Sequence, residues 1–439
     1  MKDTLVVFAY AQAGLGHMRV ADALYDGLPT GARAVLLSSR DKRITYLHRL
    51  TSIYPLLRWL LEFFQNGTPE ELFTRVVRVV LARDNTIPYQ ELSQILHQQI
   101  HLPSTILIVA THFGLAHQFA AIKEKFAKTH GVGVVLAVVV TDDSPQKVWA
   151  VPGADLIFCP SSTTKNALEA YHHTLVSTNT TTYIASPYMI TPSFALTISG
   201  KAHQSRKAAC DGASWQPIAV AVPVSGAAVQ LEFLLNIIRE LSRLSERFHF
   251  EVVSKESLFT IPFLHELAAW PRVTTHRAMW DRMIIEQYEA LYRNIVITAE
   301  ITKPSEQAFK ALLTPKQVGG SILLFSQPIG RQERDNLRFF ARHDLIPSTE
   351  EQELLWELSE KGAVLASSPD PQLLEKAKHW RGLRLPTPSS SAAKFITWTL
   401  ANGVWASMGS FSSFPEDPGL HSDGVARFWK RIAEYIAAT

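Results

Sequence analysis

Cysteine, long apolar runs and a strong excess of either charge are all scarce in this chain of 439 residues. Its two cysteines, Cys159 and Cys210, are too few and too far apart for a disulfide framework or a zinc site. No stretch of about 18 uninterrupted apolar residues occurs, so no segment is expected to span a bilayer. The formal net charge of +3 is too small to indicate a nucleic-acid partner.

What the chain does contain is the composition of a globular protein, with 46% hydrophobic residues. A prior of about 150 residues per domain predicts two or three domains. The apolar run at Met1–Phe8 is short and breaks at Gln12, which predicts a buried first strand rather than a signal peptide, and hence a cytoplasmic protein. The 16 histidines are scattered, so we expect neither a metal nor a cofactor.

Short β-rich apolar runs alternate with longer amphipathic segments along the chain. This alternation predicts parallel sheets with crossover helices, an α/β fold. The clearest predicted strands are Thr4–Ala9, Ala34–Leu37, Thr105–Ala110, Val132–Val140, Asp155–Cys159, Ile218–Val222, Phe248–Val253, Ile295–Thr298, Ser321–Phe325 and Ala363–Ala366.

A polar stretch without periodicity, residues 198–216, separates two such alternations and predicts an interdomain linker. We therefore expect an N-terminal domain over 1–197 and a C-terminal domain over 217–439. The latter ends in a predicted helix, Val425–Ala438, whose packing partner the pattern does not specify. The expected fold is two Rossmann-like domains facing one another across a cleft, with ligands at the carboxyl ends of the strands.

Two glycines, Gly14 and Gly16, follow the first predicted strand directly before His17. They permit a tight turn and expose backbone amides at the start of a helix, a natural place for an anion or a sugar oxygen. A dinucleotide-binding fingerprint needs a third glycine where Arg19 stands, so NAD binding is disfavoured. The simpler alternative is an ordinary strand-to-helix turn with a histidine on the surface.

Polar residues also follow two other predicted strands. His112 comes after one of them, and Asp142 and Asp143 come after the next. Because ligands of parallel sheets bind at the carboxyl ends of strands, these residues are candidates for a functional site. The alternative, above all for Asp143, is that the aspartate caps a helix.

Several motifs of the N-terminal half appear in a familiar order: Gly14-Leu15-Gly16-His17, Thr111-His112, Thr141-Asp142, Trp149, Asp155–Ser161 and Lys165–Leu168. Together they resemble the N-terminal half of the diacylglycerol glycosyltransferases, which are monogalactosyldiacylglycerol synthase and its bacterial processive relatives. These enzymes belong to the GT-B group that includes the peptidoglycan GlcNAc transferase. The family shows a glycine turn ending in His, a Thr-Asp at a strand end, a nearby Trp and a Pro-Ser strand before a helix.

The C-terminal half carries a second match. The segment Gly330–Asn336 is similar to the family's Gly-Gln-Glu-x-x-Asn segment, which lies by the donor sugar. Thr302-Lys303-Pro304 is similar to the start of the preceding donor motif. The order and spacing of these motifs over most of the chain make the combination specific.

The chain departs from the family where the nucleotide is recognised. The family's donor motif continues through glycines to a Glu that holds the ribose hydroxyls of UDP. Those glycines are missing here, and Lys310 stands where that Glu is expected. Arg331 separates Gly330 from Gln332, and the usually glycine-rich loop Pro223–Ala227 has one glycine. Either the donor site is remodelled or the protein has lost activity.

The resemblance implies transfer, with inversion, of a hexose or N-acetylhexosamine from a UDP-sugar to a lipid hydroxyl, diacylglycerol above all. His17 is expected as the base, because the unperturbed pKa of a histidine, near 6.5, suits proton transfer at neutral pH. Asp142 is expected to orient the base or the acceptor, and the reverse assignment is open. The other implied contacts are Gly16, Ser225, Gly226, Lys303, Gln332, Glu333 and Asn336 for the donor, and His112 and Trp149 for the acceptor or membrane.

For Gln332 and Glu333 the alternative is the exposed first turn of a helix. A catalytically impaired homologue that binds a nucleotide sugar or a lipid and acts as a regulator is the main rival function, favoured by the Lys310 substitution. A transferase for a polyprenyl-linked or soluble glycan acceptor is another.

Apolar residues recur every three to four positions between Tyr46 and Phe64, with basic residues interspersed. Such a surface suits anionic lipid, so we expect a peripheral protein on the inner face of the cell membrane. The residues expected at this membrane surface are Arg43, Arg49, Arg58 and Trp59. A second stretch, Leu72–Leu81, carries Arg75 and Arg78. The alternative is an ordinary amphipathic core helix with one solvated face.

Overall fold

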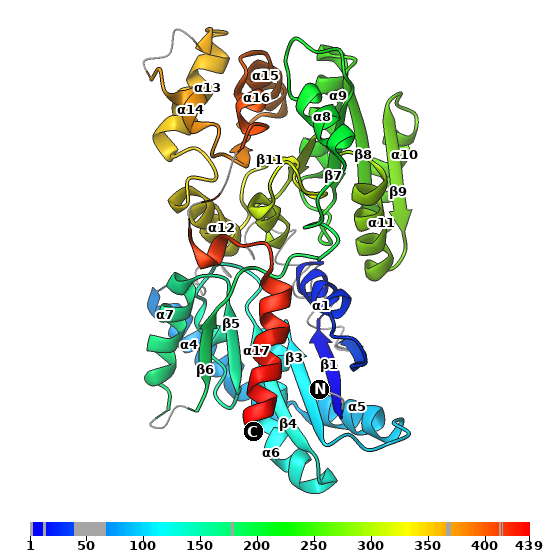
Figure 1. Cartoon of the computed structure of the whole chain (residues 1–439), viewed down its shortest axis with the longest axis vertical. Coiled ribbons are helices and arrows are strands. Elements are labelled where there is room, and N and C mark those ends of the chain that lie inside the picture. Colours follow the sequence, from blue (N-terminus) through cyan, green and yellow to red (C-terminus); the bar gives the residue numbers. More distant parts are fainter. Residues whose placement is uncertain are drawn as a thin grey trace. The chain divides into compact units, whose positions relative to one another are not determined.

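The computed structural model describes residues 3–11, 15–38, 67–176, 180–365, 370–411, 414 and 416–439. They form two compact units (Figure 1). Unit 1 comprises Met1–Pro192 with His421–Thr439, and unit 2 comprises Ser193–Leu420. Each unit is built on one parallel six-stranded sheet with helices packed on it, which confirms the predicted α/β class of two Rossmann-like units.

The sheet of unit 1 has the strand order β2-β1-β3-β4-β5-β6. Its strands are β1 (Thr4–Tyr10), β2 (Arg33–Ser38), β3 (Thr105–Ala110), β4 (Gly133–Val139), β5 (Leu156–Cys159) and β6 (Thr182–Ala185). The strand β1 pairs with β2 on one side and with β3 on the other, so the chain reverses its winding direction there. The carboxyl ends of β1 and β3 thus flank a topological switch point, where ligands of such sheets bind.

The helices of unit 1 bury the apolar faces of this sheet. They are α1 (Gly16–Asp26), α4 (Gly67–Arg83), α5 (Thr86–His97), α6 (Phe113–His130), α7 (Ser162–His173), α17 (Gly424–Ala438) and the 3-10 turn η1 (Lys147–Trp149). The strands β1, β3 and β4 are nearly continuous runs of buried aliphatic residues, because helices cover both faces of a parallel sheet.

The sheet of unit 2 has the order β12-β11-β10-β7-β8-β9. Its strands are β7 (Ile218–Pro223), β8 (Phe248–Lys255), β9 (Val273–Ala278), β10 (Ala299–Thr302), β11 (Ile322–Phe325) and β12 (Gly382–Arg384). Here the winding reverses at β7 and β10, which pair with each other. The carboxyl ends of β7 and β10 therefore flank the switch point of unit 2.

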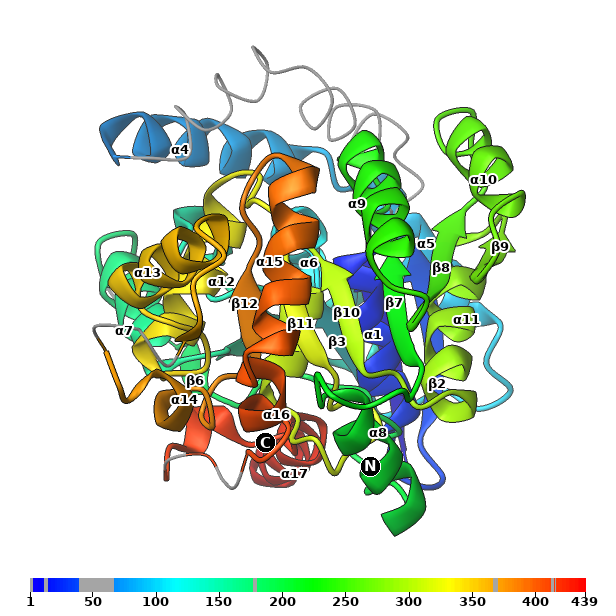
Figure 2. The same ribbon diagram turned by 90° about the horizontal axis from the view of Figure 1, so that it is seen from above.

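Helices cover this second sheet as well. They are α8 (Gly200–Ala209), α9 (Leu231–Leu244), α10 (Ile261–Ala268), α11 (Asp281–Asn294), α12 (Arg331–Arg342), α13 (Thr349–Glu360), α14 (Leu373–Lys376), α15 (Ser389–Ala401) and α16 (Val404–Met408), with the 3-10 turns η2 (Glu306–Leu312) and η4 (Pro418–Leu420). The helices α9 and α15 pack against each other over the sheet (Figure 2).

Two features of the predicted domain organisation differ from the structure. The supposed linker contains α8, and Ala209 and Cys210 at its end are buried in the core of unit 2. The C-terminal helix α17 belongs to unit 1, because Trp429 donates a hydrogen bond to the Leu24 carbonyl at 3.0 Å and Phe428 packs on Phe158. Its buried aromatic side chains specify this contact, which the chain order could not indicate.

Two strand predictions also need correction, and three strands were missed. The predicted strand Ile295–Thr298 ends before β10 begins, because the true strand carries the buried charge of Glu300. The described part of Ala363–Ala366 is not a strand. The strands β6, β9 and β12 were not predicted, since they are short or carry polar residues.

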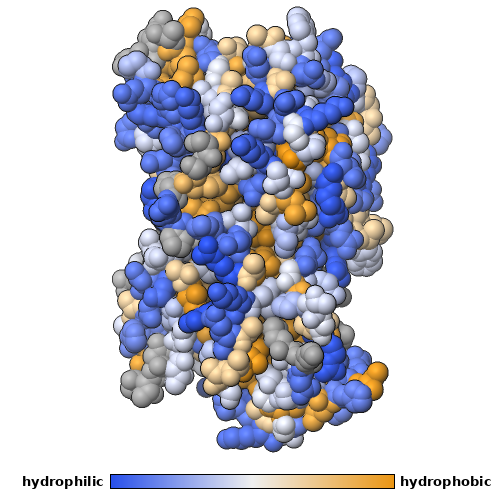
Figure 3. Space-filling model, in the orientation of Figure 1, coloured by the Kyte–Doolittle hydropathy of each residue, from blue (hydrophilic) through white to orange (hydrophobic). Residues whose placement is uncertain are grey.

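The surface of the described chain is mostly polar. On the face shown in Figure 3, hydrophilic residues predominate and apolar areas are scattered between them, as is normal for a globular protein. None of the described helices combines the length and apolar character that crossing a bilayer requires.

Candidate functional site

The first candidate site lies at the carboxyl ends of the strands of unit 1. His17 is the second residue of α1, which follows β1. His112 directly precedes α6, which follows β3. Asp142 follows β4, and Trp149 ends η1. These four residues come from distant parts of the chain, and the parallel sheet brings them to the same edge.

The side chains around His17 are in direct contact with it. The rings of His17 and His112 lie 4.9 Å apart, nearly perpendicular, and the Trp149 ring lies 6.3 Å from His17. The Oγ1 atom of Thr141 is 3.5 Å from His17 Nδ1 and donates to Asp142 Oδ2 at 3.4 Å. Thr141 therefore links the two residues predicted to handle the proton.

Two hydrogen bonds fix the backbone of this site. Thr111 Oγ1 donates to the His17 carbonyl at 2.8 Å, which ties the start of α1 to the end of β3. The Gly114 amide donates to His112 Nδ1 at 3.2 Å, so His112 caps α6. Its ring also stacks on Phe113, with centroids 4.6 Å apart.

Burial separates the roles of these residues. His17 is half-buried, whereas Asp142, His112 and Trp149 are 8%, 3% and 1% exposed. Trp149 and His112 therefore present little side-chain surface to solvent, and their assignment to the acceptor or the membrane stays a prediction. Both pack around His17, because the crossover loops turn their aromatic rings inward.

A third histidine, His117, supports the site through a contact with the backbone of η1. Its Nε2 donates to the Val148 carbonyl at 2.9 Å, which holds η1 and hence Trp149 in place. Burial lowers the pKa of His117 to about 4, so the ring is neutral at physiological pH.

Asp143 has a structural role. Its Oδ1 atom accepts hydrogen bonds from Ser161 Oγ and, at 2.7 Å, from Thr164 Oγ1. Ser161 in turn accepts from the Thr164 amide and caps α7. Asp143 thus secures the start of a helix, in line with the helix-capping alternative.

Some predicted residues cannot be placed. Gly14 and the membrane residues Arg43, Arg49, Arg58 and Trp59 lie outside the described residues. Gly16 is described and begins α1, directly before His17.

The second candidate site lies at the carboxyl ends of the strands of unit 2. The loop after β7 contains Ser225 and Gly226 and leads into α9. Ser225 Oγ accepts from the Val229 amide at 3.4 Å. Gln230, with a left-handed φ of 61°, bonds to the Ser326 hydroxyl and the Gln327 carbonyl after β11. These hydrogen bonds connect the loop after β7 to the loop after β11.

Lys303, directly after β10, pairs with Glu333 near the start of α12. The other oxygen of Glu333 accepts from the Ile329 amide at 2.6 Å. Asn336 is fully buried and donates to the Pro304 carbonyl at 3.0 Å, so it fixes the loop after β10. Both oxygens of Glu333 are thus engaged, and the residue is 6% exposed. Gln332 beside it is only half-buried.

Lys310 does not occupy a ligand-facing position. Its Nζ bonds to Glu300 Oε2 at 2.7 Å and to the Tyr288 hydroxyl at 2.8 Å, and lies 3.4 Å from the centre of the Tyr292 ring. Gln307 also bonds to Glu300. Burial and the Glu300 charge raise the pKa of Tyr292 well above its ordinary value.

A second carboxylate of this segment is Glu306, which lies in the first turn of η2 and is half-buried. It stands three residues after Lys303, at the switch-point edge of the sheet. The expectation that Lys310 replaces the ribose-binding Glu of the family is therefore corrected: Lys310 belongs to the core, and Glu306 is the carboxylate nearer that edge.

Sequence reasoning missed four contributors to these two sites: His117, Gln230, Glu306 and Ser326. Ser326 directly follows a buried apolar strand, a signal that could have identified it. His117 and Gln230 act through single contacts that depend on the fold. Among the described residues, no group of three or more His, Cys, Asp or Glu side chains is placed to hold a metal ion.

Comparison with known proteins identifies the fold. No protein-family model matches the chain, and no curated protein matches its sequence. Its structure is similar to a complex of S. aureus MnaA with UDP, with 9% identity, coverage of 100% of this chain and 98% of the other, and a TM-score of 0.50. It is also similar to the UDP-GlcNAc 2-epimerase from Neisseria meningitidis bound to UDP-GlcNAc, with 10% identity, coverage of 98% and 99%, and a TM-score of 0.50. The chain therefore has the GT-B type of fold, which these UDP-sugar enzymes share.

Proposed function

We propose that this protein binds a UDP-sugar and transfers the sugar to a hydroxyl group, with inversion at the anomeric carbon. The observation that carries the proposal is the placement of His17. This half-buried histidine stands at the switch point of unit 1, and Thr141 links its Nδ1 to Asp142. A histidine held through one ring nitrogen beside a carboxylate is the arrangement that general-base catalysis requires.

The reaction is written with His17 as the base. The acceptor oxygen attacks the anomeric carbon while the bond from that carbon to the diphosphate oxygen breaks. The acceptor proton passes to His17, for which we assign Nε2 because Nδ1 faces Thr141. Asp142 orients the imidazole through Thr141. UDP leaves with the bonding electron pair.

Unit 2 is proposed to hold the donor. The start of α9, after Ser225 and Gly226, offers backbone amides to the diphosphate, and Lys303 offers a positive charge. We assign Glu306 to accept hydrogen bonds from the ribose hydroxyls, and Gln332 to contact the sugar. Glu333 and Asn336 position this loop rather than bind the ligand.

A lipid acceptor, diacylglycerol above all, is proposed from the surface of α4. Its exposed face combines apolar and basic side chains: Leu72, Arg75, Val76, Val79, Val80 and Arg83. Arginines among exposed aliphatic side chains suit a layer of anionic headgroups, which would keep the protein at the inner face of the membrane.

The reaction can be tested by following a panel of UDP-sugars by proton NMR with vesicles that contain diacylglycerol. We expect release of UDP together with a glycosylated lipid of inverted anomeric configuration. Transfer to a soluble or polyprenyl-linked acceptor instead would refute the lipid assignment alone. Conversion of the UDP-sugar to its 2-epimer without release of UDP would refute transfer, and binding without turnover would identify a catalytically impaired homologue.

The membrane proposal has its own test. We expect flotation with vesicles that contain anionic lipid, and reduced flotation after Arg75→Glu with Arg83→Glu. Arg243→Glu is the matched control, because Arg243 is similarly exposed but lies on α9 of unit 2. Flotation that does not depend on anionic lipid, or that Arg243→Glu reduces equally, would contradict the proposal.

A further inference from the structure

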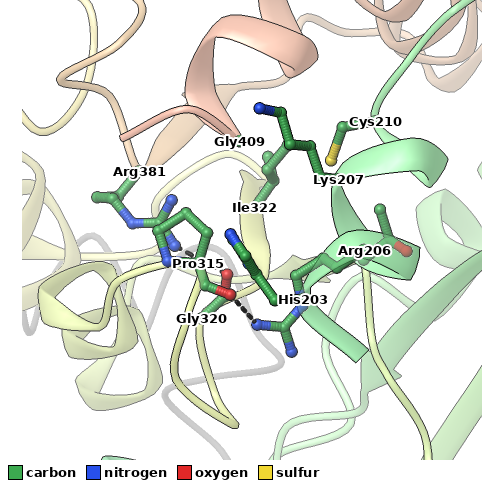
Figure 4. Close-up of a pocket in the computed structure, with 10 residues that line it drawn as sticks. His203, Arg206, Lys207, Cys210, Pro315, Gly320, Ile322, Arg381 and Gly409 are labelled. Atoms are coloured by element: carbon green, nitrogen blue, oxygen red, sulfur yellow. Dashed lines mark hydrogen bonds between the residues drawn. The ribbon is translucent and has the colours of Figure 1, made fainter. Parts of the chain in front are cut away.

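A small cavity lies in unit 2, at the opposite edge of the sheet from Lys303. Thr298, which directly precedes β10, and Ile322, the first residue of β11, both line it. The cavity therefore lies where these parallel strands begin, and it has room for about one water molecule. Figure 4 shows that basic side chains from α8 and from the segment before β12 surround it.

Two buried arginines approach this cavity. Arg206 of α8 is 3% exposed and donates to the carbonyls of Pro315, Gln317 and Val318 at 2.7–2.8 Å. Arg381 is fully buried and donates to the carbonyls of Leu313, Gly320 and Ser321 at 2.8–3.3 Å. Both guanidinium groups thus hold the segment 313–321, which connects η2 to β11, and all of these acceptors are uncharged.

Several donors remain unpaired around the cavity. Arg206 Nε, Arg381 Nη1 and His203 Nδ1 are buried and have no hydrogen-bond partner. A buried polar group without a partner is costly, so native proteins rarely leave three of them beside one cavity.

The two arginines also lack a counter-charge. Burial lowers the pKa of Arg206 to about 10 and that of Arg381 to about 9, and the Arg206 charge lowers the latter further. Both remain charged at neutral pH. Within the described part of the chain, no carboxylate pairs with either group or affects its pKa. The neighbouring thiol of Cys210 stays neutral, because burial raises its pKa to about 12.

We propose that this cavity binds one small inorganic anion of about the size of chloride, held by Arg206 and Arg381. Two buried cations without a carboxylate favour a negative charge beside them, and room for about one water molecule favours a monatomic ion over phosphate. Lys207, an exposed residue of the same helix, also lines the cavity and adds to the positive potential there. The anion would neutralise the arginines that hold segment 313–321.

The site can be located by anomalous diffraction from crystals of the whole chain soaked in sodium bromide. We expect a bromide peak in the cavity beside Arg206 and Arg381. In solution, chloride should raise the unfolding temperature relative to gluconate at equal ionic strength, by about 4 °C when chloride exceeds its Kd tenfold. Absence of the peak, or equal unfolding temperatures in the two salts, would overturn the proposal.

Variants make the test specific. Arg206→Met should abolish the chloride-dependent shift if that variant folds. Lys207→Met alters only an exposed lining residue and should weaken chloride binding several-fold. Lys201→Met on the same helix is the matched exposed control and should leave the shift unchanged. An equal shift in Lys207→Met and Lys201→Met would contradict the role of Lys207, and a larger effect of phosphate than of chloride would contradict the size assignment.

Discussion

The carboxyl ends of the strands carry different chemistry in the two units. In unit 1 the edge is formed by histidine, threonine, tryptophan and one aspartate, linked by the long contacts of Thr141 to His17 and Asp142. In unit 2 the corresponding edge carries the ion pair of Lys303 and Glu333. The first arrangement suits the transfer of a proton, and the second suits the binding of a charged ligand.

The buried residues that stabilise the carboxyl ends of the strands also differ between the two units: one unit uses charged side chains and the other a neutral one. Unit 2 buries the charged pair of Glu300, in β10, and Lys310, in η2. Unit 1 instead uses His117, which is kept neutral by burial. Removing one partner of a buried ion pair lowers the free energy of unfolding, because the other charge stays buried without a partner. A buried neutral histidine lowers the free energy of unfolding when the pH falls, because the unfolded state then binds more protons.

The largest effect is expected for Lys310→Met. This change leaves Glu300 buried without its positive partner, so it should lower the free energy of unfolding by about 3–5 kcal/mol, measured by urea denaturation. The double variant Glu300→Gln with Lys310→Met removes both charges and should recover most of that loss. If the free energy of unfolding of Lys310→Met lies within about 1 kcal/mol of the wild-type value, the pair of Glu300 and Lys310 does not stabilise this part of unit 2.

The pH dependence of stability tests the support of unit 1. Because the folded state holds the pKa of His117 near 4, the unfolded state binds more protons between about pH 6.5 and pH 4. Stability is therefore fully present above about pH 6.5 and should fall by about 3 kcal/mol as the pH drops to 4. His117→Gln keeps an N–H donor for the Val148 carbonyl but does not titrate. The fall in its stability between pH 6.5 and pH 4 should therefore be smaller than that of the wild type by about this amount. An unchanged pH profile in this variant would contradict the assignment.

Removal of the proposed base should affect the rate and not the fold. His17→Ala is expected to lower kcat at least about a hundredfold, with little change in the unfolding temperature, since His17 is half-buried. Asp142→Asn should lower kcat less than His17→Ala does if Asp142 only orients His17. It should lower kcat more if Asp142 is the base and His17 orients it. Steady-state kinetics of both variants would decide between these assignments, and near-wild-type rates in both would remove them from acid–base catalysis.

The smallest effect is expected for Lys303→Met at the edge of unit 2. Loss of this charge should weaken UDP binding about tenfold, which appears as a higher KM for the donor with a nearly unchanged kcat. Lys303→Arg keeps the charge and the contact with Glu333 and is the matched control. A reduced kcat at an unchanged KM would instead show that Lys303 acts in the chemical step. That result would contradict the proposal that unit 2 binds the donor and unit 1 handles the proton.

Much of the fold could be predicted from the sequence, because β1, β3, β4 and β7 are nearly continuous runs of buried apolar residues. The misplacement of β10 has a physical cause. Glu300 lies in the middle of that strand and is fully buried, and its tertiary contacts with Lys310, Gln307 and two tyrosine hydroxyls make a charge acceptable there. A pattern of hydrophobic residues cannot show such a compensation.

The candidate site shows the same limit. His17, His112 and Asp142 could be predicted together, because each follows a buried parallel strand and the fold brings such ends to one edge. The direction of Lys310 could not be predicted, since its inward turn depends on Tyr288 and Glu300. Arg206 and Arg381 at the cavity of unit 2 are 175 positions apart in the chain, and both donate hydrogen bonds to segment 313–321. Their proximity depends on this tertiary contact, so it could not be predicted from the sequence.

Calorimetric titration of the whole chain with UDP and with UDP-sugars tests the central claim most directly. The account predicts saturable binding of UDP with a Kd below the millimolar range, and nearly equal binding by His17→Ala, because that residue is assigned to the acceptor proton and not to the nucleotide. Absence of measurable heat with UDP and every UDP-sugar at millimolar concentration would contradict the assignment of this protein as a UDP-sugar enzyme.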